Sequence, residues 1–141
     1  MATPVPGGIA VNSELAFEYA GLCDTRSGLL EDPINNITTF LAILNSALES
    51  TTLVSSSADR ISELFNSDNP PYRDNVKDYA GEASAAKDAV TTVHENLTSL
   101  VTQLSTLLEQ LITDQSFCKE RCQTWMTIYN EKLEEERYTI Y

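Results

Sequence analysis

The fold is decided by residues 97–112, which read LTSLVTQLSTLLEQLI. With Leu97 as position a of a heptad, leucine occupies every a and d position up to Leu111. Apolar residues at these two positions form a continuous stripe along one face of an α-helix. The segment therefore predicts a helix that packs its leucine face against other helices.

The same register extends in both directions from this segment. Further a positions hold Val76, Ala83, Val90, Cys118 and Trp125, and further d positions hold Tyr79, Ala86, Val93, Asp114, Arg121 and Ile128. Val101, Leu108 and Tyr129 add an e column, which gives the wider apolar face expected inside a helical bundle. The two charged d residues either follow a helix end near Thr113 or pair with charges on a neighbouring helix.

Two further helices are expected before this one. The first begins at Ser13, with Asn12 or Ser13 as its cap, and ends near Gly28. The second begins at Asp32, where the carboxylate caps the helix and proline fills its first position, and it extends to Phe65.

The second helix has a weak point and a clear end. The hydroxyl-rich residues 51–57 favour a bend or break, because their side chains compete for backbone carbonyls. Prolines and turn-forming residues in 66–75 predict that the chain reverses direction there.

These elements predict an all-α protein, an elongated antiparallel hairpin or bundle of three to four helices with a long heptad-patterned C-terminal helix. Residues 1–12 contain two prolines and a Gly-Gly pair and are expected to form a flexible arm. Residues 13–141 are expected to form a single helical-bundle domain. Residues 115–137 either continue the long helix, in which case their stripe needs another chain, or fold back as a further helix.

The charge balance limits the classes of partner. The chain has 21 acidic and 9 basic residues and a net charge of −12, which argues against nucleic acid because no cationic surface faces the phosphates. The longest uncharged stretch, Pro33–Leu48, is shorter than the roughly 20 apolar residues that span a bilayer, so no membrane span is expected. The N-terminus lacks the features of a secretory signal, which favours a soluble intracellular protein.

The reactive side chains do not form a recognisable catalytic motif. Cys118 and Cys122 lie one helical turn apart and supply half of a zinc site, with Cys23 and His94 as the remaining candidates for ligands. His94 lacks the spacing of a di-iron motif or of a catalytic triad. We therefore expect no enzymatic activity, no metal and no cofactor, and buried thiols.

The sequence favours a structural or interaction protein that assembles with itself or with a partner helix through the long heptad face. The expected contact residues are Leu111, Cys118, Trp125, Ile128, Tyr129, Tyr138 and Tyr141. For Trp125 and Tyr129, burial at the bundle end is an equal alternative. A second hypothesis is a small acidic inhibitor or regulator that places Glu131 and residues 134–136 in a basic cleft of another macromolecule.

Overall fold

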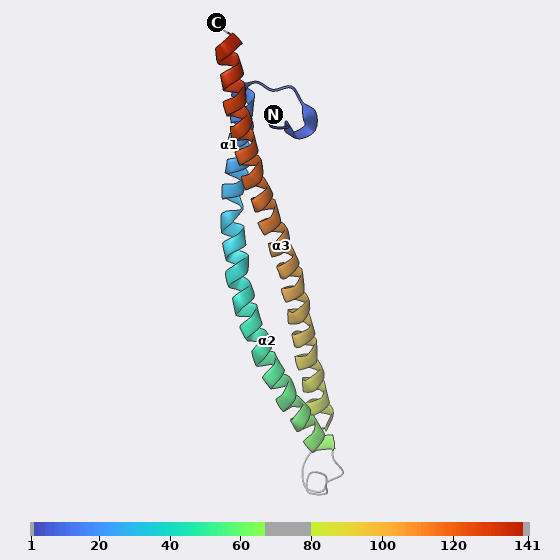
Figure 1. Cartoon of the computed structure of the whole chain (residues 1–141). Helices are drawn as coiled ribbons and strands as arrows, with labels where there is room; N and C mark the ends of the chain where they lie inside the picture. The colour runs from blue at the N-terminus through green and yellow to red at the C-terminus, as the bar shows by residue number, and fades with distance from the viewer. Residues whose placement is uncertain (1, 67–79, 140–141) are drawn as a thin grey trace. The chain divides into compact units, whose positions relative to one another are not determined.

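The computed structural model describes residues 2–66 and 80–139, and these are mostly helical, with no strand among them. Its elements are a short 3-10 helix η1 (Pro6–Gly8), α1 (Ser13–Leu29), α2 (Glu31–Asn66) and α3 (Ala80–Thr139), as Figure 1 shows. The predicted all-α class is confirmed, and the two long helices α2 and α3 pack against each other. The predicted reversal falls largely on residues 67–79, outside the described residues.

The helices form two compact units. Unit 1 consists of residues 1–37 and 107–141, and unit 2 consists of residues 38–106. Helix α3 contributes to both units, because it runs without interruption from Ala80 to Thr139.

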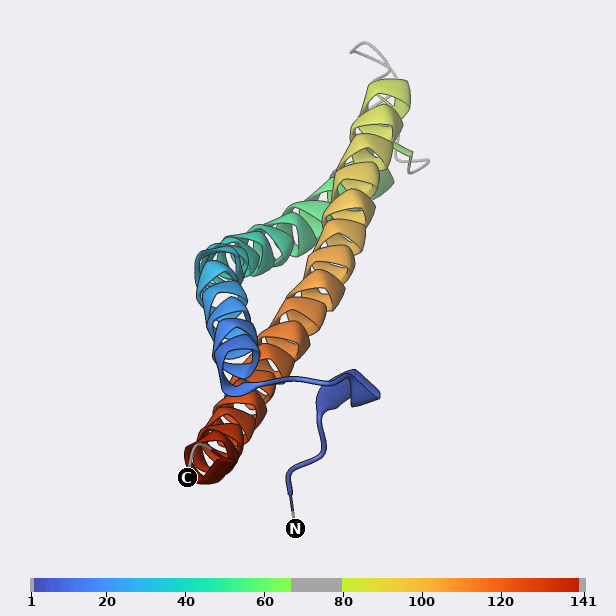
Figure 2. The same cartoon turned by 90° about the horizontal axis from the view of Figure 1, so that it is seen from above.

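Helix α1 begins where the sequence predicts. The Asn12 side chain accepts a hydrogen bond from the Leu15 amide at 2.8 Å, which satisfies one of the free amides of the first turn. The helix then packs on the C-terminal part of α3, and the two lie side by side in Figures 1 and 2. This pairing builds unit 1.

The start of α2 differs from the prediction by one residue, and its cap differs in kind. Leu30 keeps a helical conformation (φ −82°, ψ −14°), and its carbonyl accepts from the Ile34 amide at 3.1 Å. Helix α2 therefore starts at Glu31, and Asp32 lies inside its first turn, where it is not the capping residue. The chain passes from α1 to α2 almost without a break, and Pro33 contributes only a missing amide donor.

Helix α2 is not broken at residues 51–57. The hydroxyls of Thr51 and Thr52 both donate to the Leu48 carbonyl at 2.9 Å, and Ser56 donates to the Thr52 carbonyl at 3.2 Å. These bonds reach back one turn, which a helix accommodates without losing its own backbone bonds.

Helix α3 also continues through Thr113, and residues 115–137 belong to it. Asp114 does not cap a new helix. Its carboxylate pairs with Arg26 of α1 at 2.7 Å, which is the second of the two predicted alternatives. The stripe of this segment is covered by α1 of the same chain, so the expectation that it needs another chain is wrong for residues that face α1.

Candidate functional site

The interior of unit 1 is built from small side chains on α1 and large ones on α3. Ala16 and Ala20 are fully buried against Trp125 and Ile128, which are 6% and 1% exposed. The Tyr19 ring packs on the Trp125 ring with centroids 4.9 Å apart, a tilted geometry that aromatic pairs favour. Alanine on one helix lets the bulky side chains of the other approach closely and fill the space between them.

The structure divides the predicted contact residues into three groups. Cys118, Trp125 and Ile128 are buried within unit 1, so in this fold their surface is occupied by the chain itself. Leu111 and Tyr129 are half-buried. Tyr138 is exposed, and Tyr141 lies outside the described residues.

The burial of the first group has a physical reason. Helix α1 lies along the face of α3 that carries these residues, so unit 1 uses their apolar area for its own stability. A partner would have to displace α1 to reach them. We therefore do not retain Cys118, Trp125 and Ile128 as partner contacts.

Two of the C-terminal glutamates hold the N-terminal segment. Glu131 accepts from the Thr3 amide at 3.0 Å and from the Thr3 hydroxyl at 2.6 Å, and Glu136 accepts from the amide and hydroxyl of Ser13. The hydrogen bonds from Thr3 and Ser13 lower the pKa of Glu131 and Glu136 respectively, because they stabilise the charged carboxylates. Residues 2–12 thus contact α3, while their predicted flexibility stays a prediction.

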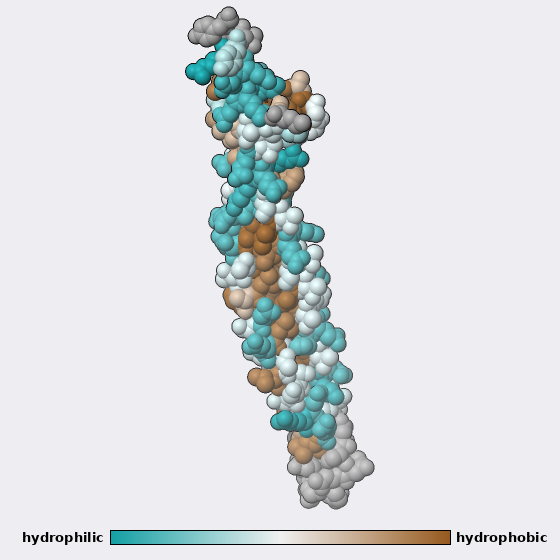
Figure 3. All heavy atoms as spheres, viewed as in Figure 1, coloured by the Kyte–Doolittle hydropathy of each residue, from teal (hydrophilic) through white to brown (hydrophobic). Residues whose placement is uncertain are grey.

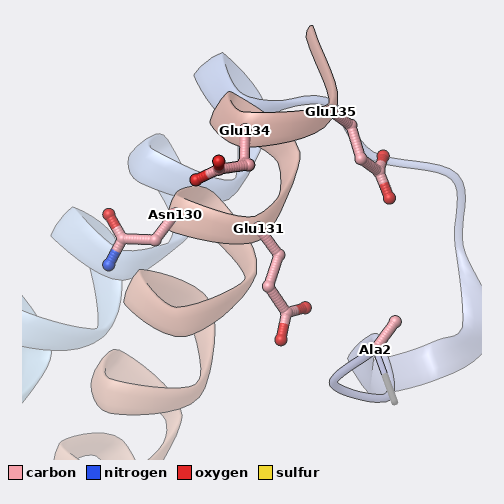
Figure 4. Close-up of a pocket in the computed structure, with 5 residues that line it drawn as sticks. All are labelled: Ala2, Asn130, Glu131, Glu134 and Glu135. Carbon is pink, nitrogen blue, oxygen red and sulfur yellow. The ribbon is translucent and has the colours of Figure 1, made fainter. Parts of the chain in front are cut away.

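An open hollow of about 410 Å³ lies between this segment and α3. Its lining consists of Ala2, Asn130, Glu131, Glu134 and Glu135, and Figure 4 shows Glu131 and Glu135 directed toward the side of the N-terminal segment. Lys132 pairs with Glu135 at 3.2 Å. The hollow is acidic, and much of its charge is already engaged within the chain.

A polar layer closes unit 1 at the other end of α1. The Arg26 guanidinium donates twice to Asp114, at 3.1 and 2.7 Å, and this hydrogen bond and charge raise the pKa of Arg26. The Gln115 amide donates to the Ser27 carbonyl at 3.1 Å and to the Glu31 carboxylate at 2.7 Å. These bonds fix the register of α1 on α3, although exposed ion pairs of this kind add little stability.

Of the two residues that the sequence offers to join the Cys118/Cys122 pair, the structure brings Cys23 to it and not His94. Burial is the largest cause that raises the pKa of Cys23, followed by the proximity of Cys118 and of Cys122. All three thiols are free. Within the described residues, no group of three or more His, Cys, Asp or Glu side chains has the arrangement needed to hold a metal ion.

His94 belongs to unit 2, where its ring contacts a residue of α2. The His94 ring Nδ1 and the Thr51 hydroxyl are hydrogen-bonded at 2.8 Å, which links α2 to α3. Lys87 pairs with Asp59 at 3.4 Å about two turns further along both helices. In this antiparallel register His94 ties the two helices of unit 2 together.

Unit 2 leaves much of its apolar surface uncovered. Its most exposed large apolar side chain is Leu53, at 72%. Among the described residues of this unit, only Leu44, Ser62 and Ala83 are buried. A shallow groove of about 270 Å³ runs between the helices and is lined by Ser50, Thr51 and Val54 of α2 and by Ala89, Val90 and Val93 of α3. Figure 3 shows hydrophobic side chains gathered in a band along the helices.

One helical stretch among the described residues meets the length and composition of a membrane span. The stretch is Ser13–Phe65, whose most apolar 18-residue window has a mean hydropathy of 1.3 and is 11% buried. A single helix of this kind is weak evidence, because the core helix of a soluble protein has the same properties. The absence of a span stays a prediction.

Comparisons with family models, with curated proteins and with solved structures find no match for this chain. The class that the structure defines is thus an all-helical protein with two long packed helices.

Proposed function

We propose that the chain is a non-enzymatic structural or interaction protein whose unit 2 receives a helix from another chain, either a second copy or a partner. The observation that carries the proposal is the exposure of aliphatic side chains on both walls of the groove. Val54 of α2 is 51% exposed and Val93 of α3 is 52% exposed. Contiguous exposed apolar surface of this kind is typical of interaction sites.

The heptad columns of α3 support this proposal, because they differ in exposure within unit 2. The a column, which is buried or half-buried, holds Ala83, Val90, Leu97 and Leu104. The d column, which is exposed, holds Ala86, Val93 and Leu100. Helix α2 therefore uses one half of the apolar stripe and leaves the other half for a further helix.

The mechanism would be the burial of this uncovered half. Each fully buried valine or leucine contributes roughly 1.5–3 kcal/mol, so a few such residues offset the several kcal/mol that association costs. A third helix laid in the groove would complete a three-helix layer, as amphipathic helices do in apolar grooves.

A matched pair of substitutions tests the proposal. Val93→Asp places a charge in the groove, while Thr91→Asp places the same charge about 200° away on the same helix and also replaces a β-branched residue. We expect the wild-type chain to show a concentration-dependent mass above that of the monomer in light scattering. Val93→Asp should lower that mass without loss of helical circular dichroism, and Thr91→Asp should leave it unchanged.

Two results would contradict this use of the groove. One is an equal change in mass for Val93→Asp and Thr91→Asp, which would show that the groove is not the contact surface. The other is a wild-type chain that stays monomeric at every accessible concentration, which would exclude the second copy as the occupant.

The acidic inhibitor hypothesis has less support. Glu131 and Glu136 are already hydrogen-bonded to the N-terminal segment, so a basic cleft would compete with Thr3 and Ser13 for them. Added salt separates the two hypotheses. Salt screens the repulsion between acidic copies and leaves apolar packing intact, whereas it weakens a charge-driven complex.

A further inference from the structure

The contacts between α1 and α3 place Cys23 opposite the Cys118/Cys122 pair. Ser27 contacts Gln115 on one side of Cys23, and Tyr19 packs on Trp125 on the other side. Cys23 lies midway between Ser27 and Tyr19 on α1, so in an antiparallel pair it faces the middle of the segment 115–125 on α3. Cys118 and Cys122 flank that midpoint on the same face of the helix.

Burial confirms that the thiols share this interface. Cys23 and Cys122 are both half-buried and both pack against the cluster of Ala16, Ala20, Trp125 and Ile128. Cys118 is 4% exposed. Among the described residues, no group of three or more His, Cys, Asp or Glu side chains could hold a metal ion, so we consider the thiols in pairs.

Reagents from solvent can reach this interface. A small groove of about 200 Å³ is lined by Cys122 and Met126 of α3 and by Phe17, Ala20, Gly21 and Asp24 of α1. Cys122 is thus at the surface of a hollow beside the α1 turn that carries Cys23. A partly exposed thiol beside a second thiol is the arrangement that favours exchange with a small disulfide.

We propose that Cys23 and one thiol of the Cys118/Cys122 pair form a reversible disulfide that joins α1 to α3. Cys122 is the expected partner because it is less buried than Cys118, and Cys118 is the third thiol that can exchange with the bond. The oxidant is a low-molecular-weight disulfide. One thiolate attacks it, forms a mixed disulfide and releases one small thiol; the second protein thiolate then displaces the second small thiol. The two protein thiols lose two electrons and two protons, and the small disulfide gains them as two thiols.

The disulfide would join α1 and α3 covalently, whereas the contacts described within unit 1 are non-covalent. It would link residues 23 and 122 covalently and so close a long loop that includes all of unit 2, which restricts the unfolded chain. The N-terminal helix could then no longer separate from α3 while the bond is intact.

Peptide mapping tests the proposal directly. Trypsin cleaves after Arg26, Lys119 and Arg121, so Cys23, Cys118 and Cys122 fall in three separate peptides, 1–26, 88–119 and 122–132. The folded chain would be incubated with oxidised glutathione, alkylated at free thiols, digested without reductant and analysed by mass spectrometry. The expected product joins 1–26 to 122–132. A product that joins 1–26 to 88–119 also supports a disulfide between α1 and α3, with Cys118 as the partner of Cys23. Reduction with dithiothreitol should release both peptides.

Cysteine variants guard against other sources of thiol loss. Cys118→Ser should still give the linked peptides 1–26 and 122–132, whereas Cys23→Ser should give no intramolecular bond. The proposal is overturned if the oxidised wild type contains only a link between 88–119 and 122–132, only links between two chains, or only stable glutathione adducts. Circular dichroism of each variant shows whether it is folded. Electrophoresis without reductant compares the mobility of each oxidised sample with that of the reduced wild type.

Discussion

Replacing Ile128 with alanine tests whether α1 and α3 form a true interior in unit 1. Ile128 is 1% exposed and contacts the cluster of Ala16, Ala20 and Trp125. The substitution removes three carbon groups, and at about 0.8 kcal/mol per buried group the lost transfer free energy is about 2.4 kcal/mol. The cavity left behind brings the expected loss of unfolding free energy to about 2–5 kcal/mol. That is a large share of the stability of a small domain.

The chain supplies a matched control on the same helix. Ile112 of α3 is 45% exposed, so Ile112→Ala removes side-chain area that is already half in water. Alanine also has the higher helix propensity, and we expect a loss of about 1 kcal/mol or less.

Urea unfolding measures both variants. Trp125 is the sole tryptophan of the chain, so its fluorescence reports on the interior of unit 1, while circular dichroism reports on all helices. Equal losses for the two variants, or a larger loss for Ile112→Ala, would refute the packing of α1 on this face of α3.

Three further predictions concern the N-terminal segment and unit 2. The hydrogen bonds from Thr3 hold the pKa of Glu131 below its usual value near 4.5, so this contact stabilises the fold above pH 4.5 and is lost as the pH falls through the lower pKa of the folded state. The NMR resonance of the Thr3 amide should shift at this step, and Glu131→Gln should abolish the shift. Leu44→Ala, at a buried position of α2, should lower the free energy of unfolding by about 2–5 kcal/mol in thermal or urea unfolding, while Ile43→Ala at the exposed neighbouring position should lower it by less than about 1 kcal/mol. Similar losses for the two variants would contradict the assignment of Leu44 to the buried face of α2. Thr51→Val removes the partner of the His94 ring and should cost about 0.5–1.5 kcal/mol, with a shifted ring resonance; an unshifted resonance would argue against the contact.

The helical class follows from local patterns, whereas the sequence leaves open whether the long helix continues through Thr113, which the structure shows that it does. The leucines of residues 97–112 recur at heptad spacing, and no proline or glycine interrupts the sequence from there to its end. The Asn12 cap is likewise a local feature, because the capping side chain and the amide it accepts from are three residues apart. Such features depend on neighbours in the chain and are readable without knowing the fold.

The contents of the interface depend on pairing, which periodicity does not determine. A heptad stripe indicates which side of α3 is apolar, but it does not identify the helix that covers it. The approach of Cys23 to Cys118 and Cys122 follows from the register that Arg26 and Asp114 help to set across 88 residues of sequence. The sequence alone therefore indicated the pair of thiols on α3 and offered Cys23 only as one of two candidates to join them, the other being His94.

Helix α1 shows where hydropathy misleads. Its large apolar residues Phe17, Leu22 and Leu29 are exposed, whereas its buried face consists of Ser13, Ala16, Ala20 and Ser27. Close approach to a helix that carries Trp125 favours small side chains on the opposing face, because the bulky side chains of α3 fill the available space. The buried face of α1 is thus selected by side-chain volume. Burial of Trp125 by α1 and exposure of the apolar residues of α1 are two results of the same packing.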